Sequence, residues 1–447
     1  MRPADETTDE SQRVPELGHG ALPGVVMVWG HGGPSSAVLP LERGQIVLGR
    51  GVQPDWFADD ERASREHCRL EYDGRLWSMT DLGSRNGTFL NNVRLAGAKL
   101  VSGQPLFRIG RTLVWAVQDV RPHRSGVLTE EGGLVLGGVL KRAWAEIELA
   151  AHAGNTLCLR GESGSGKELA ARAFHEAATS KSASAPFVGV NCAAIPEGLA
   201  ERLLFGARRG AYSGATADVQ GYVQAAHRGT LFLDEIAELD LRVQAKLLRV
   251  LETREVLALG ATKPEPVEIR VCVAAHADLR ERVQAGQFRE DLYYRVGRPE
   301  VKIAPLRERL DELPWLIDSQ IRAHAPELRA SARLVEACAE RPWPGNVREL
   351  IGEVRRAAHR AQRAGRDEVD ATDLDADAGL RLADSAVDEA ELPTAEFPDS
   401  EQIQRALSET GGNVTRAARQ LGLHRNQLRR WLAKNATLPT TEPKDPA

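Results

Sequence analysis

The sequence predicts a multidomain protein with an all-β sandwich, a parallel α/β core carrying a helical lid, and a small all-α helix-turn-helix. Three observations predict this. Short apolar runs separated by Gly, Asp and Asn turns fill residues 24–120, which is typical of a sandwich. Strand-like runs alternate with long helical patterns over residues 134–365, which indicates a parallel sheet. Residues 401–436 are helical in pattern and basic.

Composition fits a globular chain of several domains. The 447 residues correspond to about three domains at roughly 150 residues each. A net charge of −5 excludes a wholly basic nucleic-acid coat but allows a local basic module. No apolar run reaches the length of about 18 residues that a membrane helix needs, and the polar start lacks a signal-peptide core. The five cysteines form no C-x-x-C pair. We expect a cytoplasmic protein with no membrane partner.

Two segments have the composition of linkers. Residues 121–133 are short and polar, and we expect them to connect the sandwich to the core. Residues 366–400 hold twelve acidic and two basic side chains, which predicts a solvated acidic linker. The following residues 401–436 hold seven basic and two acidic side chains. Local charge therefore predicts the partners better than the total does.

A glycine-rich loop follows the predicted strand Thr156–Arg160 and precedes a helix expected over residues 168–178. Glycines let backbone N–H groups wrap phosphates, the helix N-terminus favours anions, and a lysine reaches the β and γ oxygens. A strict match would have Ser or Thr after the lysine, where this chain has Glu. The alternative is an ordinary strand-to-helix turn. The loop residues are Gly161, Glu162, Ser163, Gly164, Ser165, Gly166, Lys167 and Glu168.

A second apolar strand, expected over residues 230–233, ends in Asp234 and Glu235. Taken alone, this is an ordinary capped turn about as often as a catalytic pair. In P-loop ATPases one carboxylate here lies near magnesium and another polarises the attacking water. Together with the loop, the pair predicts nucleotide hydrolysis.

Seven motifs then give a specific resemblance. They read GESGSGKE, NCAAIPE, LLFGARRGAYSGA, GTLFLDEI, GQFREDLYYR, APLRERLDEL and WPGNVREL. In this order they resemble the sigma-54-dependent transcription activators, a branch of the AAA+ ATPases, over residues 134–365. That family tolerates Glu after the loop lysine.

The resemblance implies roles for matching positions. Lys167 and the loop would bind ATP phosphates, Asp234 would organise Mg²⁺ through water, and Glu235 would activate the attacking water. Asn191 matches a residue that restrains this glutamate. Arg289 and Arg295 match arginines supplied to the neighbouring subunit, and Arg348 matches a nucleotide-sensing lid arginine. Arginines acting between subunits imply a homo-oligomeric ring, which the family predicts to be a hexamer.

Two places depart from the family pattern. The loop that contacts the sigma factor has Tyr and Ser where the family has Phe and Thr, and Arg208 and Arg209 make its approach more basic. On the strand that senses nucleotide, Ala275 lacks the usual hydroxyl, and His276 follows it. The residues of the sigma-factor loop are Gly210, Ala211, Tyr212, Ser213, Gly214 and Ala215.

The predicted sandwich resembles a forkhead-associated (FHA) domain, which binds phosphothreonine peptides. The resemblance rests on LGR at 48–50, SREH at 64–67 and DLGSRNGT at 81–88. It implies that Arg50 and Ser64 contact phosphate with help from Arg65, that Asn86 holds the peptide backbone, and that His67 braces the loop. A phosphate suits such donors. The implied partner is a phosphothreonine protein or a Ser/Thr kinase upstream.

Residues 411–432 predict helix, turn and helix, with Gly422 at the turn. They resemble the Fis-type helix-turn-helix, whose second helix lies in the major groove. A helical hairpin used only for dimerisation is the alternative. The expected DNA-binding residues are His424, Arg425, Asn426, Gln427, Arg429 and Arg430.

The sequence thus predicts a phospho-responsive ATPase that binds enhancer DNA and remodels sigma-54 RNA polymerase with ATP and Mg²⁺. One alternative is a repressor or scaffold with FHA and DNA-binding domains, whose ring binds ATP without activating sigma-54. A second alternative, a protein unfoldase, is disfavoured by the terminal DNA reader.

Overall fold

The computed structural model describes residues 21–41, 44–52, 55–129, 133–179, 185–196, 198–212, 215–381, 403, 405 and 406. The chain divides into two compact units, Met1–Leu382 and Ala383–Ala447. In the second unit the described residues Ile403, Arg405 and Ala406 are helical. The rest of the predicted helix-turn-helix, with all six expected DNA-binding residues, lies outside the described residues.

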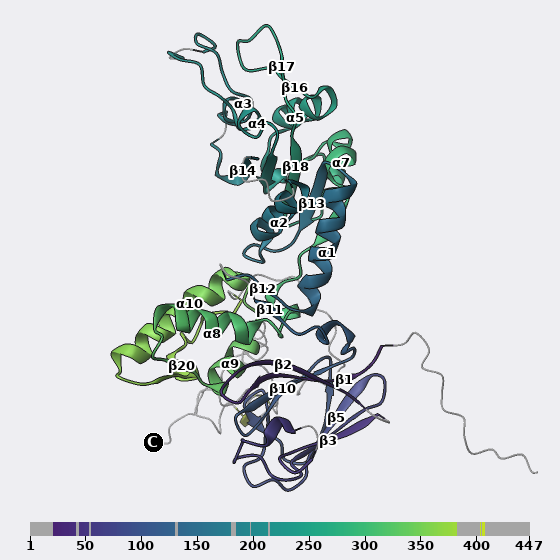
Figure 1. Cartoon of the computed structure of the whole chain (residues 1–447), viewed down its shortest axis with the longest axis vertical. Coiled ribbons are helices and arrows are strands. Elements are labelled where there is room, and N and C mark those ends of the chain that lie inside the picture. The colour runs from purple at the N-terminus through teal and green to yellow at the C-terminus, as the bar shows by residue number, and fades with distance from the viewer. Residues whose placement is uncertain are drawn as a thin grey trace, which may run out of the picture. The chain divides into compact units, whose positions relative to one another are not determined.

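The N-terminal part of the first unit is a two-layer β-sandwich, as the sequence predicts (Figure 1). Its six-stranded sheet has the order β2-β1-β10-β9-β6-β7, and its four-stranded sheet has the order β3-β4-β5-β8. The strands are β1 (Gly24–Gly30), β2 (Gly33–Pro40), β3 (Gln45–Leu48), β4 (Cys68–Tyr72), β5 (Leu76–Asp81), β6 (Thr88–Leu90), β7 (Val93–Arg94), β8 (Ala98–Ser102), β9 (Leu106–Ile109) and β10 (Thr112–Val117). A 3₁₀ turn, η1 (Asp55–Phe57), lies between β3 and β4.

Strand β1 is buried along its whole length. Val25 and Met27 pack inside the sandwich, whereas Val26 and Val28 pack against the lid. Because successive side chains of a strand face opposite sides, a strand with both faces covered has a continuous apolar sequence. The run GVVMVWG at 24–30 therefore reflects two packed faces.

Residues 121–129 contain regular structure, which corrects the interpretation of residues 121–133 as a simple linker. They contain η2 (Arg121–His123) and β11 (Leu128–Thr129), which pairs antiparallel with β12 (Val135–Leu136). His123 is buried and stacks edge-on against Trp115 of β10. The polar composition did not reveal this, because one buried histidine anchors the segment.

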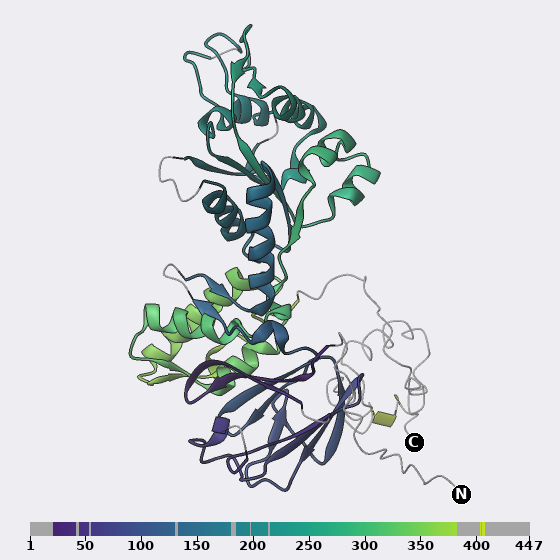
Figure 2. The same ribbon diagram turned by 45° about the vertical axis from the view of Figure 1, so that its right-hand side comes forward.

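The core is a parallel five-stranded sheet in the order β14-β15-β18-β13-β19 (Figure 2). The strands are β13 (Thr156–Arg160), β14 (Phe187–Asn191), β15 (Thr230–Asp234), β18 (Arg270–Ala275) and β19 (Glu300–Lys302). The predicted strands over 156–160 and 230–233 are therefore confirmed.

Helices cover both faces of this sheet. Helices α1 (Gly138–Ala153) and α2 (Lys167–Thr179) pack on one face, and α5 (Leu241–Thr253) and α7 (Glu290–Val296) pack on the other. Smaller elements are α3 (Ala200–Phe205), α4 (Tyr222–Ala225), α6 (Leu279–Gln284), β16 (Glu255–Val256), β17 (Glu265–Pro266), η3 (Cys192–Ala194) and η4 (Ile236–Glu238). No helix among the described residues has both the length and the apolar character needed to cross a bilayer.

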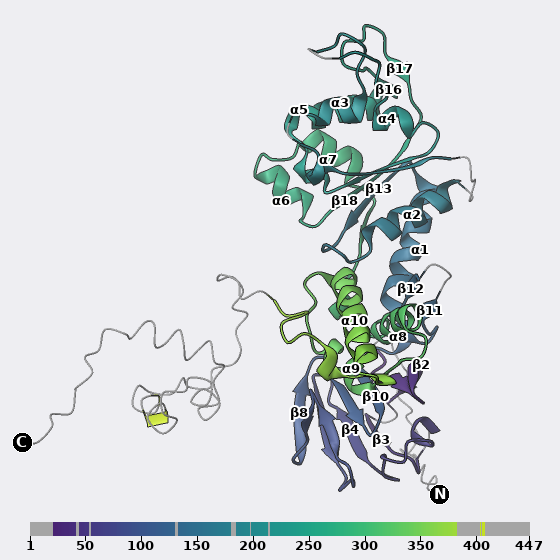
Figure 3. The same cartoon turned by 90° about the vertical axis from the view of Figure 1, so that its left-hand side faces the viewer.

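The lid contains η5 (Leu306–Glu308), α8 (Leu313–His324), α9 (Ala332–Ala339) and α10 (Asn346–Arg363). Helix α8 packs beside β2, and α9 packs beside β9 and β10, so the lid contacts the outer face of the sandwich (Figure 3). The two share one hydrophobic core.

The lid also extends past the predicted boundary at residue 365. Strands β20 (Arg329–Ala330) and β21 (Glu368–Val369) pair in parallel, and η6 (Ala371–Asp373) follows. Val369 and Asp373 are buried. The predicted start of the acidic linker, residue 366, is therefore too early. A few apolar side chains pack the first part of this acidic segment against the lid despite its charge.

Candidate functional site

The glycine-rich loop lies between the end of β13 and the start of α2. Gly164 and Gly166 have φ angles of +73° and +109°, which side-chain-bearing residues rarely adopt. A Cβ on Gly164 would lie 2.3 Å from the carbonyl oxygen of Gly345. Because α2 begins at Lys167, its N-terminus, with free N–H groups, faces the loop. The sequence therefore builds an anion cradle here.

Lys167 and Ser165 supply buried polar groups to this cradle. Lys167 Nζ donates to the carbonyls of Gly161 and Glu162 at 2.9 and 3.3 Å. Ser165 Oγ is buried and has no hydrogen-bond partner in the described part of the chain. The site thus offers three kinds of donor, which together fit a polyphosphate. They are a buried ammonium, an unpaired hydroxyl and the backbone N–H groups of a loop with left-handed glycines.

The two carboxylates that follow β15 reach the same site. Glu235 Oε1 lies 3.7 Å from Lys167 Nζ. Burial raises the pKa of Asp234 above its usual range, while the charge of Lys167 partly opposes that shift. Glu235 has a left-handed backbone with φ +51°, a strained geometry that turns the chain immediately after the strand. Carboxylate oxygens at this position suit Mg²⁺.

His276 completes this group, and its Nδ1 lies 2.8 Å from Glu235 Oε2. It follows β18, next to β15 in the sheet, so the carboxyl ends of both strands meet here. Asn191 lies at the end of β14, and its Oδ1 accepts the backbone N–H of Ala193. The structure thus pairs Glu235 with His276 and Lys167 and pairs Asn191 with its own turn.

Glu168 lies on an exposed part of α2 and pairs with Arg172 one turn later. Arg289 pairs with Asp291 at 2.7 Å, and Arg295 donates to the carbonyl of Leu251 at 3.1 Å. Arg295 also lines a cavity of about 190 Å³ at the amino ends of the core strands. The phosphate loop follows the carboxyl end of β13. Arg295 therefore lies at the opposite end of the core strands from the phosphate loop of its own chain.

The lid holds the phosphate loop from the other side. Arg307 forms two hydrogen bonds with the Glu162 carboxylate, at 2.7 and 2.8 Å. Asn346 donates to Glu162 and to the carbonyl of Ser163, and Arg348 Nη1 lies 3.3 Å from Ser163 Oγ. The sequence singled out Arg348 but missed Arg307 and Asn346. Arg307 lies in the motif APLRERLDEL and Asn346 in the motif WPGNVREL, so the sequence signal that could have identified them was their place in these motifs.

Residues 210–212 and 215 form a turn between α3 and α4, and Ser213 and Gly214 lie outside the described residues. Gly210 N–H donates to Ala215, and the Tyr212 ring lies 5.3 Å from the guanidinium carbon of Arg202. Arg208 pairs with Asp218 and Glu265. Those two carboxylates offset part of the basic charge predicted for this approach.

The sandwich loops converge around Ser64. Arg50 N–H donates to the Ser64 carbonyl at 2.8 Å, and Ser64 N–H donates to His67 Nδ1 at 2.9 Å. Ser64 Oγ accepts the N–H of Arg85, and Asn86 Nδ2 donates to the carbonyl of Arg62. The structure therefore brings Arg50, Ser64 and the loop of Asn86 together, with His67 buried beneath them. Arg65 follows Ser64 and is exposed.

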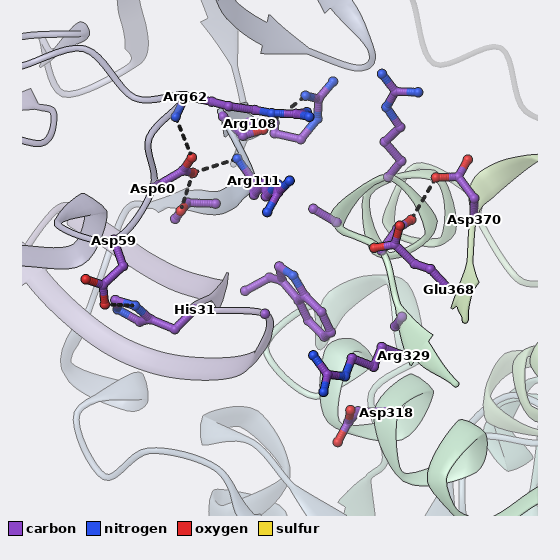
Figure 4. A pocket seen from close by; sticks show the side chains of 18 of the residues that line it. His31, Asp59, Asp60, Arg62, Arg108, Arg111, Asp318, Arg329, Glu368 and Asp370 are labelled. Atoms are coloured by element: carbon purple, nitrogen blue, oxygen red, sulfur yellow. Dashed lines mark hydrogen bonds and ion pairs between the residues drawn. The ribbon is translucent and has the colours of Figure 1, made fainter. Parts of the chain in front are cut away.

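A larger cavity of about 1270 Å³ lies between the sandwich and the lid. Figure 4 shows arginines of the sandwich opposite charged residues of the lid. They are Arg62, Arg108 and Arg111 on one wall and Asp318, Arg329, Glu368 and Asp370 on the other. The mixed charge favours neither an anion nor a cation.

Three family models match the chain in order. They are the FHA domain at residues 46–110, the sigma-54 interaction domain at 137–302, and the bacterial regulatory protein, Fis family, at 395–434.

Similar proteins include the nitric oxide reductase transcription regulator NorR2 of Cupriavidus necator, 40% identical over 66% of this chain and 62% of its own length. The response regulator protein PilR of Pseudomonas aeruginosa is 40% identical over 62% of this chain and 63% of its own length. The chain thus spans less than two thirds of each of these curated relatives.

Among solved structures, NtrX from Brucella abortus in complex with ATP is 28% identical. The match covers 68% of this chain and 69% of that one, with a TM-score of 0.50. The chain therefore carries an FHA domain, a sigma-54 interaction domain and a Fis-family regulatory domain in that order, and the curated proteins it is similar to include transcription regulators.

Proposed function

We propose that this protein is a phospho-responsive, ATP-hydrolysing activator that binds enhancer DNA and remodels sigma-54 RNA polymerase. The observation that carries the proposal is the convergence of Lys167, Asp234 and Glu235 at one glycine-rich cradle. This convergence occurs in a chain that has a sigma-54 interaction domain and a Fis-type reader. We expect it to act in the cytoplasm, where polymerase and DNA are found.

In this proposal the chain's own residues bind and orient the nucleotide. The loop amides and Lys167 bind its phosphates, and Arg348 senses them from the lid. Glu235 holds and deprotonates the attacking water, with Asn191 restraining it. Asp234 fits Mg²⁺ through water, and the ion, when bound, neutralises phosphate charge. Glu168 is not proposed to bind Mg²⁺, because its carboxylate pairs with Arg172.

Arg289 and Arg295 are proposed to act on the nucleotide of a neighbouring subunit. Arg295 is exposed and Arg289 is half-buried, and their side chains bond to Asp291 and to the carbonyl of Leu251 rather than to their own phosphate loop. An arginine at a neighbour's nucleotide stabilises charge in the transition state. A head-to-tail contact of this kind closes into a ring, for which we propose six subunits.

The remaining partners follow from the other domains. Arg50, Ser64, Arg65 and Asn86 are proposed to bind a phosphothreonine protein, which a Ser/Thr kinase would supply. The loop 210–215 is proposed to contact the sigma factor. The six expected DNA-binding residues of the last domain are proposed to contact enhancer bases and phosphates.

The rival function is a repressor or scaffold whose ring binds ATP without opening promoters. The Ala275 departure and the altered residues Tyr212 and Ser213 favour it. The contact between His276 and Glu235 weighs against it, because a polar group reaches the proposed base where the usual hydroxyl is missing.

In vitro transcription decides between the two. Purified chain, sigma-54 polymerase and a supercoiled sigma-54 promoter template should give open complexes with ATP and none with a non-hydrolysable analogue. Glu235→Gln should bind ATP yet give neither turnover nor transcripts, since the loss of a general base costs about 100-fold or more. ATP turnover by the native chain without transcripts, even with phosphopeptide added, would establish the rival.

A further inference from the structure

Three charged residues just before and at the start of α8 are almost completely buried. Arg309, Asp311 and Glu312 are each only 1–2% exposed. Burying charge is costly unless every charge is paired and hydrogen-bonded. Their partners therefore indicate what this cluster holds in place.

Arg309 joins the lid to the phosphate loop. Its Nη1 donates to Glu312 Oε2 at 2.9 Å, and its Nη2 donates to the carbonyl oxygen of Ser165 at 3.0 Å. Ser165 lies within the loop, two residues before Lys167. A guanidinium presents two donors in a fixed fork and can make both contacts at once, which a lysine cannot do in the same geometry.

The other side of the cluster holds the connector that follows the FHA domain. Glu312 Oε1 accepts the N–H of Gly137, and Asp311 Oδ2 accepts the N–H of Gly138, which is the first residue of α1. Asp311 Oδ2 also lies 2.8 Å from His123 Nδ1. Burial works against ionisation of Asp311, but the His123 contact and the backbone N–H bonds, that of Gly138 included, together outweigh it and lower the pKa of Asp311.

These contacts form a continuous chain of neighbours. Trp115 of the FHA sheet stacks on His123, His123 contacts Asp311, and Glu312 holds Arg309 on Ser165. Asp311 and Glu312 are consecutive at the start of one helix, so they cannot shift independently. A displacement of the connector would therefore move the guanidinium that fixes the loop carbonyl.

We propose that Arg309 is a positioning residue of the phosphate loop, and that the chain His123–Asp311–Glu312–Arg309 transmits the state of the FHA connector to nucleotide affinity. This inference rests on the proposed ATPase function and adds a route of regulation to it. The residues that contact the nucleotide stay the same, and the geometry of their loop changes.

Arg309→Lys in the full chain tests the first half. The lysine keeps the positive charge beside Glu312, but its single nitrogen cannot reach both Glu312 and the Ser165 carbonyl, so one contact is lost while the fold should persist. Losing one buried charged hydrogen bond is expected to weaken ATP-analogue binding and raise KM about tenfold, with kcat within about twofold. Arg322→Lys, at an exposed position of the following helix α8, is the matched control and should change neither. Unchanged binding and KM in Arg309→Lys would overturn the positioning role.

His123→Phe tests the transmission. The phenyl ring keeps the packing on Trp115 and removes the contact with Asp311, so analogue affinity should fall severalfold. His123→Asn, whose amide can occupy the Nδ1 position, should restore it. The double variant with Arg309→Lys should be less impaired than the product of the single effects, because both act through one chain. Wild-type affinity in His123→Phe, no restoration by His123→Asn, or strictly multiplicative effects would overturn it.

Binding of a non-hydrolysable ATP analogue, measured by calorimetry, separates this inference from the proposed function. If the native chain binds the analogue but does not hydrolyse ATP, the proposed enzymatic activity fails, while the binding comparisons among the variants still decide the inference. If the native chain hydrolyses ATP and the variants bind like it, only the inference fails.

Discussion

His276 Nδ1 lies 2.8 Å from Glu235 Oε2, so a histidine supplies the polar contact at the proposed base in a site that lacks the usual sensor hydroxyl. The His276 side chain is 52% exposed, whereas that of Glu235 is 18% exposed. The histidine is thus open to solvent and to an approaching subunit, and it can orient a carboxylate that is itself largely enclosed.

His276→Ala is expected to lower kcat for ATP about tenfold and to leave KM nearly unchanged, because the carboxylate loses its orienting partner and the phosphate contacts persist. Steady-state phosphate release measures this. His276→Asn should recover part of the rate. Wild-type kcat in His276→Ala would show that the contact is incidental.

Tyr212→Ala is expected to abolish transcription while leaving ATP turnover within about twofold. The half-exposed ring is the largest apolar group of the described part of the loop, and the catalytic cradle does not use it. Tyr212→Phe keeps the ring over Arg202 and should transcribe normally. Coupled ATPase and run-off transcription assays measure both. Equal transcription by Tyr212→Ala and the native chain would remove this residue from the sigma-factor contact.

Arg50→Ala is expected to weaken phosphothreonine-peptide binding at least tenfold, because the guanidinium supplies charge-assisted donors to phosphate. The backbone contact of residue 50 with Ser64 is retained, so the loop should keep its fold. Calorimetric titration compares phosphorylated and plain forms of peptides drawn from a phosphothreonine library. Arg75→Ala, at an exposed arginine in the β4–β5 turn at the other end of these strands, is the control. The prediction is wrong if both forms bind Arg50→Ala as they bind the native chain.

The His67 ring predicts a pH dependence in the FHA loops. Burial lowers the pKa of His67 below its usual 6.5, and its Nδ1 accepts the N–H of Ser64, which requires the neutral ring. Because the unfolded chain then takes up the proton first, this stabilisation is present above about pH 6.5 and is lost as the pH falls below it.

Hydrogen–deuterium exchange of peptides covering residues 62–70 should therefore show less protection at pH 5.5 than at pH 7.5, after correction for intrinsic rates. In His67→Asn the amide oxygen can accept the same N–H without titrating, and this difference should shrink. An equal loss of protection in both proteins would assign the effect to other groups.

Arg108 of the FHA sheet and Glu336 of α9 form a buried ion pair across the junction with the lid. Arg108→Met should destabilise the chain by about 3 kcal/mol, since it leaves a buried carboxylate without its cation. Arg108→Met combined with Glu336→Met should recover most of that loss. Thermal unfolding of the two variants and the native chain measures it. A double variant no more stable than the single one would contradict this account.

Local motifs predicted the phosphate loop, the carboxylate strand and the sandwich, because each is specified by a few consecutive residues. The contacts of His276, Arg307 and Arg309 depend on where distant strands and the lid meet, and no spacing rule encodes that. The docking of Val369 was missed for a related reason, since one apolar side chain in an acidic run gives no periodic signal.

The shared core beneath β1 and β10 limits how this protein can be taken apart or recombined. Val26, Trp115 and Leu313 belong to one apolar cluster that crosses from the FHA domain to the lid. Removing the FHA domain would uncover that face of the lid, and such apolar patches drive aggregation or new associations. A sensor grafted from another regulator would need to bring a matching surface for α8 and α9. The FHA domain and the lid therefore depend on one shared core, even though the nucleotide cradle between them in the chain has cores of its own.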